Sequence, residues 1–183
     1  MRKVLLTILL SFSLLPASFA EVCFVQKVID GTTFQTINGE TVKLIGVNLD
    51  KNQNDKDAKD ISDFVRGFIS GNLIELEFDA QERDSQGNLL AYVWFEYPEE
   101  LNIETMKLPA SYEVTYVEDS LGVGHFLVFL NASMIKSGFA SPNTQEPNVK
   151  HAKLFEDIYN ERQSKNKETI ANANVHVSML SSE

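Results

Sequence analysis

Two tight-turn signals lie close together near the start of the chain, and they constrain its fold more than any other feature. Asp30-Gly31 and Asn38-Gly39 each separate segments rich in β-branched and apolar residues. Tight hairpin turns favour positive φ at their central residues, which glycine, asparagine and aspartate adopt most readily. We therefore expect three antiparallel strands, over residues 22–28, 33–37 and 41–47.

Hydrophobic periodicity after these strands predicts a helix and two further strands. Apolar residues recur at three- and four-residue spacing over residues 57–69, and Gly71 follows as a C-terminal stop. Residues 73–78 and 89–95 are short apolar runs with β-branched and aromatic side chains, which is typical of strands. Together with the first three strands, these segments indicate an α+β protein built on a small β-barrel.

The C-terminal third of the chain predicts two more helices. Residues 130–138 indicate a short helix that ends at Gly138, with Asn131 as its expected N-cap. A last helix is expected over about residues 148–164. The residues that follow are polar, so we expect residues 167–183 to form a frayed C-terminal tail.

The first twenty residues have the order of a secretory signal peptide. A basic start, Met1-Arg2-Lys3, precedes an apolar run over residues 4–15 and small residues up to Ala20. The apolar run is shorter than the roughly 20 residues that span a bilayer. We therefore expect cleavage after Ala20, a secreted or periplasmic protein, and no membrane attachment afterwards.

The acidic charge of the chain disfavours nucleic acid as a partner. The formal net charge is −10 at pH 7, and removal of Arg2 and Lys3 with the leader would make it −12. Non-specific nucleic-acid binders use a surplus of Lys and Arg to neutralise phosphates. We expect weak or no nucleic-acid binding. Cys23 is the single cysteine, so no intramolecular disulfide forms, and we expect it as a small apolar residue of the first strand.

Four phrases follow one another along the chain in a characteristic order. They are Val28-Ile29-Asp30-Gly31, Lys43-Leu44-Ile45-Gly46-Val47, residues 79–92 with Gly87 and Leu90-Ala91-Tyr92, and Asn131-Ala132 through Gly138-Phe139-Ala140. Their order and spacing resemble the staphylococcal nuclease (thermonuclease-like) family over roughly residues 22–166. The resemblance implies an oligonucleotide/oligosaccharide-binding (OB) fold, a five-stranded barrel with about three helices, over residues 21–166.

The resemblance also implies a site chemistry. Active members of the family hold a calcium ion through aspartates, use a glutamate on the attacking water, and clamp the phosphate with two arginines. Calcium prefers hard, negatively charged oxygens, and a carboxylate can orient water or accept its proton. Arginine remains charged and grips phosphate through two parallel hydrogen bonds.

All five of these family positions carry a different residue in this chain. The aspartates fall on Thr32 and Asn48, the glutamate on Lys51, and the arginines on Lys43 and Asn88. An unperturbed lysine has a pKa of about 10.4, so Lys51 would neither act as a base nor attract calcium. Losing one preorganised electrostatic contact costs about 10²–10³ in rate, so the five changes together predict a catalytically degenerate site.

Two alternatives to a degenerate binding or structural module stay open. Asp30 and Asp50 are weak candidates for a rebuilt cation site, which would make the chain a diverged calcium-dependent nuclease acting on DNA or RNA. If the site is degenerate, no cofactor is expected. The other alternative is an OB-fold module that binds a carbohydrate or a periplasmic protein.

A long insertion separates the fifth strand from the closing helix, at about residues 96–129. Typical members of the resembled family have only a brief turn there. Residues 111–117 alternate like a strand, and residues 125–129 are expected to pair with them across a glycine turn. We therefore expect an inserted β-hairpin, which offers a surface for a protein partner.

Overall fold

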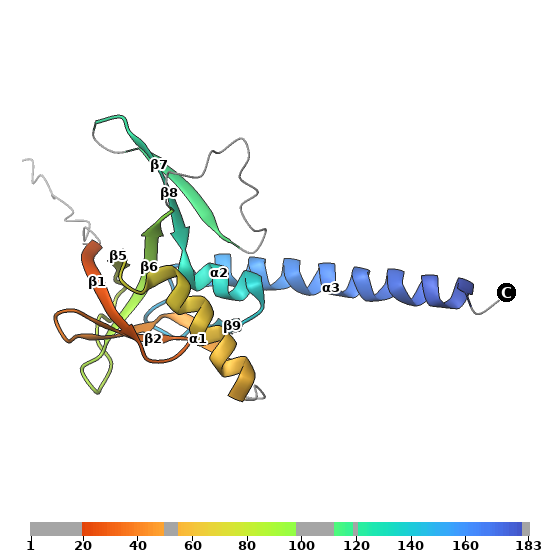
Figure 1. The fold of residues 1–183 in the computed structure, drawn as a ribbon, viewed down its shortest axis with the longest axis horizontal. Coiled ribbons are helices and arrows are strands. Elements are labelled where there is room, and N and C mark those ends of the chain that lie inside the picture. The colour runs from red at the N-terminus through yellow and green to blue at the C-terminus, as the bar shows by residue number, and fades with distance from the viewer. Residues whose placement is uncertain (1–19, 50–54, 98–111, 119–120, 181–183) are drawn as a thin grey trace, which may run out of the picture.

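Five strands close into a barrel in the computed structural model, which describes residues 20–49, 55–97, 112–118 and 121–180 (Figure 1). The strands lie in the order β3-β2-β1-β5-β6, and a parallel pairing of β3 with β6 closes the ring. This arrangement confirms the predicted α+β fold with a five-stranded barrel. Its strands are β1 (Ala20–Val28), β2 (Thr33–Thr36), β3 (Thr41–Leu44), β5 (Leu73–Glu77) and β6 (Leu89–Glu96).

The two turn signals act through different physical causes. Gly39 has a φ of 86°, as the tight turn between β2 and β3 requires. Gly31 does not have positive φ, contrary to expectation. A Cβ at Gly31 would lie 2.5 Å from Cγ2 of Ile61, so this glycine lets the first helix approach the turn. The three antiparallel strands themselves are confirmed.

The third predicted strand is two strands. β3 ends at Leu44, and β4 (Gly46–Leu49) pairs instead with β9 (Ala140–Asn143), which the sequence did not predict. Gly46 has a φ of 74°, and a Cβ there would lie 2.5 Å from the ring of Phe155. The expectation of one continuous strand over residues 41–47 is therefore wrong, because the backbone bends where the last helix packs on it.

The described residues form three helices that contribute to the core: α1 (Asp55–Ile69), α2 (Leu130–Ser137) and the first turns of α3 (Ala152–Leu180). α1 buries the predicted apolar stripe, with Ile61 and Val65 at 2% and 1% exposure. Cys23 is likewise buried in β1, and burial first, with Glu21 second, raises the pKa of its thiol to about 11.

Two expectations about these helices are wrong. Phe129, not Asn131, is the N-cap residue of α2; Asn131 lies inside the helix and is fully buried. Its amide donates to the carbonyl oxygen of Ile45, and its Oδ1 accepts from the backbone N–H of Val93. α3 continues to Leu180 rather than ending near residue 164, and it extends away from the barrel (Figure 1).

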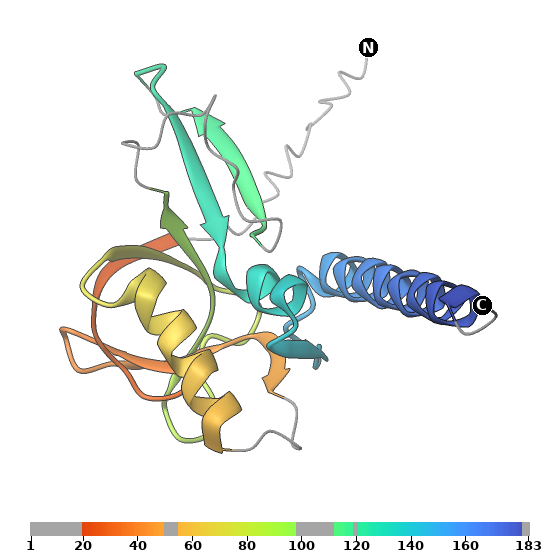
Figure 2. The same cartoon turned by 45° about the vertical axis from the view of Figure 1, so that its right-hand side comes forward.

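The predicted hairpin in the insertion is confirmed. β7 (Val114–Glu118) pairs antiparallel with β8 (Gly124–Phe129), and β8 pairs with β6 of the barrel through Trp94 and Phe129. The sheet is thereby extended by two strands, which rise beyond the barrel in Figure 2.

Other expectations fall outside the described residues or stay untested. Residues 1–19 are not described, so cleavage after Ala20 stays a prediction, as do the domain boundaries. Among the described helices, none combines the length and apolar character needed to cross a bilayer.

Candidate functional site

The two predicted phosphate-clamp positions, Lys43 and Asn88, meet at the carboxylate of Asp84. Nζ of Lys43 lies 2.7 Å from Oδ2 of Asp84, and Nδ2 of Asn88 donates to the same oxygen at 2.9 Å. The parallel pairing of β3 with β6 makes this possible, because it sets Lys43 opposite Leu90, two residues after Asn88. The structure therefore brings these two positions together, with an aspartate that was not among the predicted site residues.

Asp84 also builds the turn that holds Asn88. Its Oδ1 accepts hydrogen bonds from the backbone N–H groups of Gln86 and Asn88, at 2.9 and 3.0 Å. Gly87 completes the turn with a φ of 85°. Hydrogen bonds from Lys43 first, then from Asn88, hold the pKa of the Asp84 carboxyl well below its usual range, although burial opposes them. Asp84 is therefore a carboxylate at any physiological pH.

The charge of this cluster is balanced. Lys43 and Asp84 form an ion pair, with side chains 37% and 21% exposed, and Asn88 adds no charge. The formal charge of the three side chains is therefore zero. An arginine at position 88 would leave one positive charge over, available to an anionic ligand.

The two described positions predicted for the family's metal-binding aspartates, Thr32 and Asn48, carry neutral side chains. The backbone N–H and hydroxyl of Thr32 both donate to Oδ1 of Asp30, at 2.7 and 3.1 Å. Accepting such hydrogen bonds from residues close in sequence is a common role of aspartate in turns. Asn48 lies exposed on β4, opposite Ser141 of β9 and beyond the bend that follows β3. Two further predicted positions, Asp50 and Lys51, lie outside the described residues.

No metal-binding group of three His, Cys, Asp or Glu side chains occurs within the described part of the chain. Asp30, the one described metal candidate, therefore has no described carboxylate cluster around it. The structure does not place Asp50, so its part in a cation site stays a prediction.

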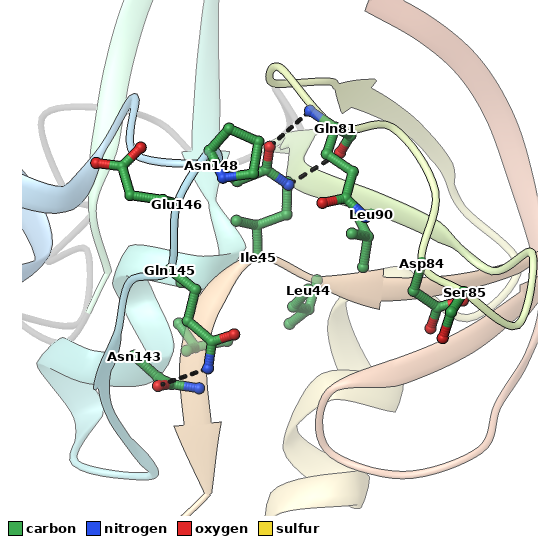
Figure 3. Close-up of a pocket in the computed structure, with 13 residues that line it drawn as sticks. Leu44, Ile45, Gln81, Asp84, Ser85, Leu90, Asn143, Gln145, Glu146 and Asn148 are labelled. Atoms are coloured by element: carbon green, nitrogen blue, oxygen red, sulfur yellow. Dashed lines mark hydrogen bonds between the residues drawn. The ribbon is translucent and has the colours of Figure 1, made fainter.

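A pocket of about 430 Å³ lies beside the Lys43–Asp84–Asn88 cluster. Asp84 and Ser85 line one side, and Asn143, Gln145 and Glu146 line the other (Figure 3). The pocket is also lined by Leu44, Ile45, Gly46, Val47, Gln81, Leu90, Pro147 and Asn148. Among these described lining residues two are acidic and none is basic.

Asn148 fixes the far wall of this pocket to the loop before Asp84. Its Oδ1 accepts from the backbone N–H of Gln81 at 2.8 Å, and its Nδ2 donates to the carbonyl oxygen of Gln81 at 2.9 Å (Figure 3). The reciprocal bonds hold two segments far apart in sequence at a set separation. The pocket is therefore preformed, with a polar rim and an apolar floor of Leu44 and Leu90.

Comparison with known proteins supports the fold and part of the resemblance. No family model matches the chain. The thermonuclease of Staphylococcus hyicus is 32% identical over 78 residues, which cover 38% of this chain and 46% of the relative. The chain thus matches less than half the length of that protein. Together, the partial match and the closed five-stranded barrel fit a thermonuclease-like fold for this chain.

Proposed function

We propose that this chain is an exported protein of thermonuclease-like fold that has lost calcium-dependent phosphodiester hydrolysis and serves as a binding or structural module. The observation that carries the proposal is the zero formal charge of the Lys43–Asp84–Asn88 cluster. The basic, apolar and small-residue order of residues 1–20 supports export.

Phosphoryl transfer needs positive charge that binds the transition state more tightly than it binds the substrate. Lys43 supplies one cation without the planar fork of arginine, and Asp84 already neutralises it. Asn88 donates its amide to Asp84 rather than offering a charge. The neighbouring pocket adds the carboxylate of Glu146 and no basic side chain among its described lining residues, which disfavours a phosphate group.

The predicted calcium-binding positions also lack the charges that calcium binding needs. Calcium binds through oxygen ligands, and its affinity depends on how many of them are charged. Thr32 and Asn48 offer neutral oxygens, and Oδ1 of Asp30 already accepts two hydrogen bonds from Thr32. A calcium ion would therefore find few uncommitted charges among the described residues at these positions.

A nuclease assay tests the proposal. Residues 21–183 are incubated with single-stranded DNA and RNA while calcium is titrated in, and the thermonuclease of Staphylococcus hyicus serves as the positive control. We expect no calcium-dependent cleavage by this chain. Robust cleavage that Asp50→Ala abolishes would contradict the proposal.

A restored variant provides the matched comparison. It carries the family residues at all five positions: Thr32→Asp, Lys43→Arg, Asn48→Asp, Lys51→Glu and Asn88→Arg. Each regained contact is worth about 10²–10³ in rate when the others are present, so calcium-dependent cleavage should appear in this variant alone. Equal, background-level cleavage by both proteins would show that more than these positions has changed.

The alternative function is a diverged calcium-dependent nuclease. The partial identity to a thermonuclease is the observation that favours it. On this alternative, Asp50 would replace the carboxylate missing at Asn48 and calcium would be the cofactor. The same assay separates the two, because only this alternative expects activity that disappears with Asp50→Ala and with calcium removal.

A further inference from the structure

A second groove, of about 310 Å³, lies where the inserted hairpin joins the barrel. It is lined by Glu75, Glu77, Trp94, Thr115, Val117, Leu127 and Lys150. None of these residues lines the pocket beside Asp84. In β5 the core takes Ile74 and Leu76, so Glu75 and Glu77 stand on the opposite face of the sheet. The hairpin therefore adds a wall to a face that the barrel alone leaves open.

Trp94 is held rigidly at the base of this groove. The ring of Phe129 stacks on it with centroids 4.0 Å apart and an interplanar angle of 13°. The indole Nε1–H donates to Oε2 of Glu77 at 2.8 Å. Phe129 lies on the β8 side of Trp94, whereas Glu75 is its partner on β5. Glu75 and Phe129 are therefore the cross-strand neighbours of Trp94 on its two opposite sides in the sheet.

The two carboxylates of the groove differ in their partners. Besides the indole, Glu77 contacts two further groups. Its Oε1 lies 2.5 Å from Nζ of Lys150, and its Oε2 lies 3.0 Å from Nε2 of His151. Burial raises the pKa of Glu77, but these hydrogen bonds outweigh it and lower the pKa to about 2. The side chain of Glu75 is partly buried, and within the described residues its carboxylate has neither a hydrogen bond nor an ion pair. One uncommitted negative charge therefore lies beside an aromatic face.

The charge and shape of the groove select a class of ligand. Glu77 and Lys150 neutralise each other, so Glu75 leaves the groove with a net negative charge, in a chain that is itself acidic. An anionic ligand is disfavoured. Thr115, Val117 and Leu127 complete the lining, and the last two are apolar. A planar cation on an alkyl stem suits all three features, because it stacks on an indole, forms paired hydrogen bonds with a carboxylate and covers apolar surface with its methylenes.

We propose that this groove binds the guanidinium group of an arginine side chain, presented by a peptide or protein partner. The guanidinium lies against the indole of Trp94 and donates to the carboxylate of Glu75, while its methylene stem lies along Leu127 and Val117. The site depends on the inserted hairpin and is separate from the Lys43–Asp84–Asn88 cluster. Its success or failure therefore leaves the proposed loss of nuclease chemistry untouched.

Trp94 is the single tryptophan of the chain, so its fluorescence reports on this groove alone. The purified protein is titrated at low ionic strength with N-acetylarginine methylamide. Its neutral isostere, N-acetylcitrulline methylamide, is the matched probe. We expect a saturable change in tryptophan emission, with the citrulline probe at least about tenfold weaker because it lacks the charge. Equal affinity for the two probes would overturn the proposal.

Two variants with the same change in charge locate the site. Glu75→Gln is expected to lower the affinity for the arginine probe at least about fivefold, because it removes the carboxylate. Glu82→Gln, in the loop between β5 and β6, lies outside the groove and is expected to change the affinity less than about twofold. Equal losses in the two variants would overturn the proposal, since net charge alone would then explain the binding.

A third probe tests the sugar alternative, and one measurement guards against misfolding. A titration with cellobiose is expected to leave the emission of Trp94 unchanged. Saturable binding of cellobiose, unaffected by Glu75→Gln, would overturn the proposal in favour of a carbohydrate site. Thermal unfolding of Glu75→Gln by circular dichroism is expected to match the parent, because the Glu75 carboxylate has no partner among the described residues.

Discussion

Asp84 and Glu77 are both carboxylates that pair with a lysine, but they lie in differently built surroundings. Asp84 receives Lys43 from β3 and three hydrogen bonds from its own turn, through Gln86 and Asn88. Glu77 receives no bond from a sequence neighbour. Its donors are Trp94 on β6 and Lys150 and His151 in the turn that leads into α3. One carboxylate therefore shapes a loop, and the other joins a helix to the barrel.

The difference teaches how each region uses its negative charge. In the Asp84 cluster the carboxylate is paired with Lys43, so the two formal charges cancel within the molecule. At the groove, Glu77 is satisfied in the same way but Glu75 beside it is not. The Lys43–Asp84–Asn88 cluster thus has no net charge, whereas the groove beside the inserted hairpin keeps one carboxylate without a described partner.

Removing the side chain of Glu77 is expected to have the largest effect. Glu77→Ala leaves Lys150, His151 and the indole N–H of Trp94 without their acceptor in a site where the carboxylate is 14% exposed. Breaking a buried pair of this kind costs about 3 kcal/mol of unfolding free energy. Urea denaturation followed by far-ultraviolet circular dichroism measures the loss.

Asp84→Ala is the matched comparison for that prediction. The bonds that Asp84 makes are mostly within one surface turn, so its loss is expected to lower the unfolding free energy less than Glu77→Ala. Equal or reversed effects would show that the loop, rather than the junction of helix and barrel, stabilises the molecule.

The pH dependence of stability is the next largest effect. Glu77 has a pKa of about 2 when folded, against 4.5 as its ordinary value, so the unfolded chain binds the proton first as the pH falls. Its contribution is fully present above about pH 5 and is lost between about pH 4.5 and 2, to at most about 3 kcal/mol. Urea midpoints measured across this range should fall less steeply in Glu77→Gln than in the parent. Parallel curves would contradict the assignment to Glu77.

The smallest expected effect concerns the charge balance at Asp84. Asn88→Arg gives the cluster one excess positive charge, and binding of a single-stranded oligonucleotide should strengthen about fivefold at low salt. The salt dependence of log K should become steeper by about 0.7, the value for one added phosphate contact. Fluorescence anisotropy measures both quantities. Asn160→Arg on α3 changes the net charge equally. An equal gain in oligonucleotide affinity from Asn160→Arg would show that net charge, rather than the cluster, explains the binding.

Much of the fold followed from local patterns. The Asn38-Gly39 turn, the apolar stripe that includes Ile61, and the inserted hairpin were predicted because each depends on residues close together in sequence. The end of α3 was not, since the polar residues after 164 carry no stop signal and those at 165–171 are exposed, so no apolar stripe marks their helix.

The candidate site was predicted in part. The resemblance identified Lys43 and Asn88 as the two phosphate-clamp positions, and in the structure both contact Oδ2 of Asp84. Asp84 was missed, although the spacing of Asp84, Gly87 and Asn88 is a turn signal that would have found it. Asn131 was wrongly predicted as an N-cap, because its preference for helix starts is local, whereas its partners lie on β6 and at the bend between β3 and β4.

Turn chemistry and hydrophobic periodicity predicted the five barrel strands, apart from the break before Gly46, and the first two helices, because those properties depend on neighbours in the chain. The bend at Gly46, the shared role of Asp84 and the groove around Trp94 arose only when distant segments packed together. Each depends on segments that lie close together only in the folded chain. Glu75 keeps its charge because Lys150 and His151 pair with Glu77 instead. Such balances are set by three-dimensional contact, which residue order alone does not specify.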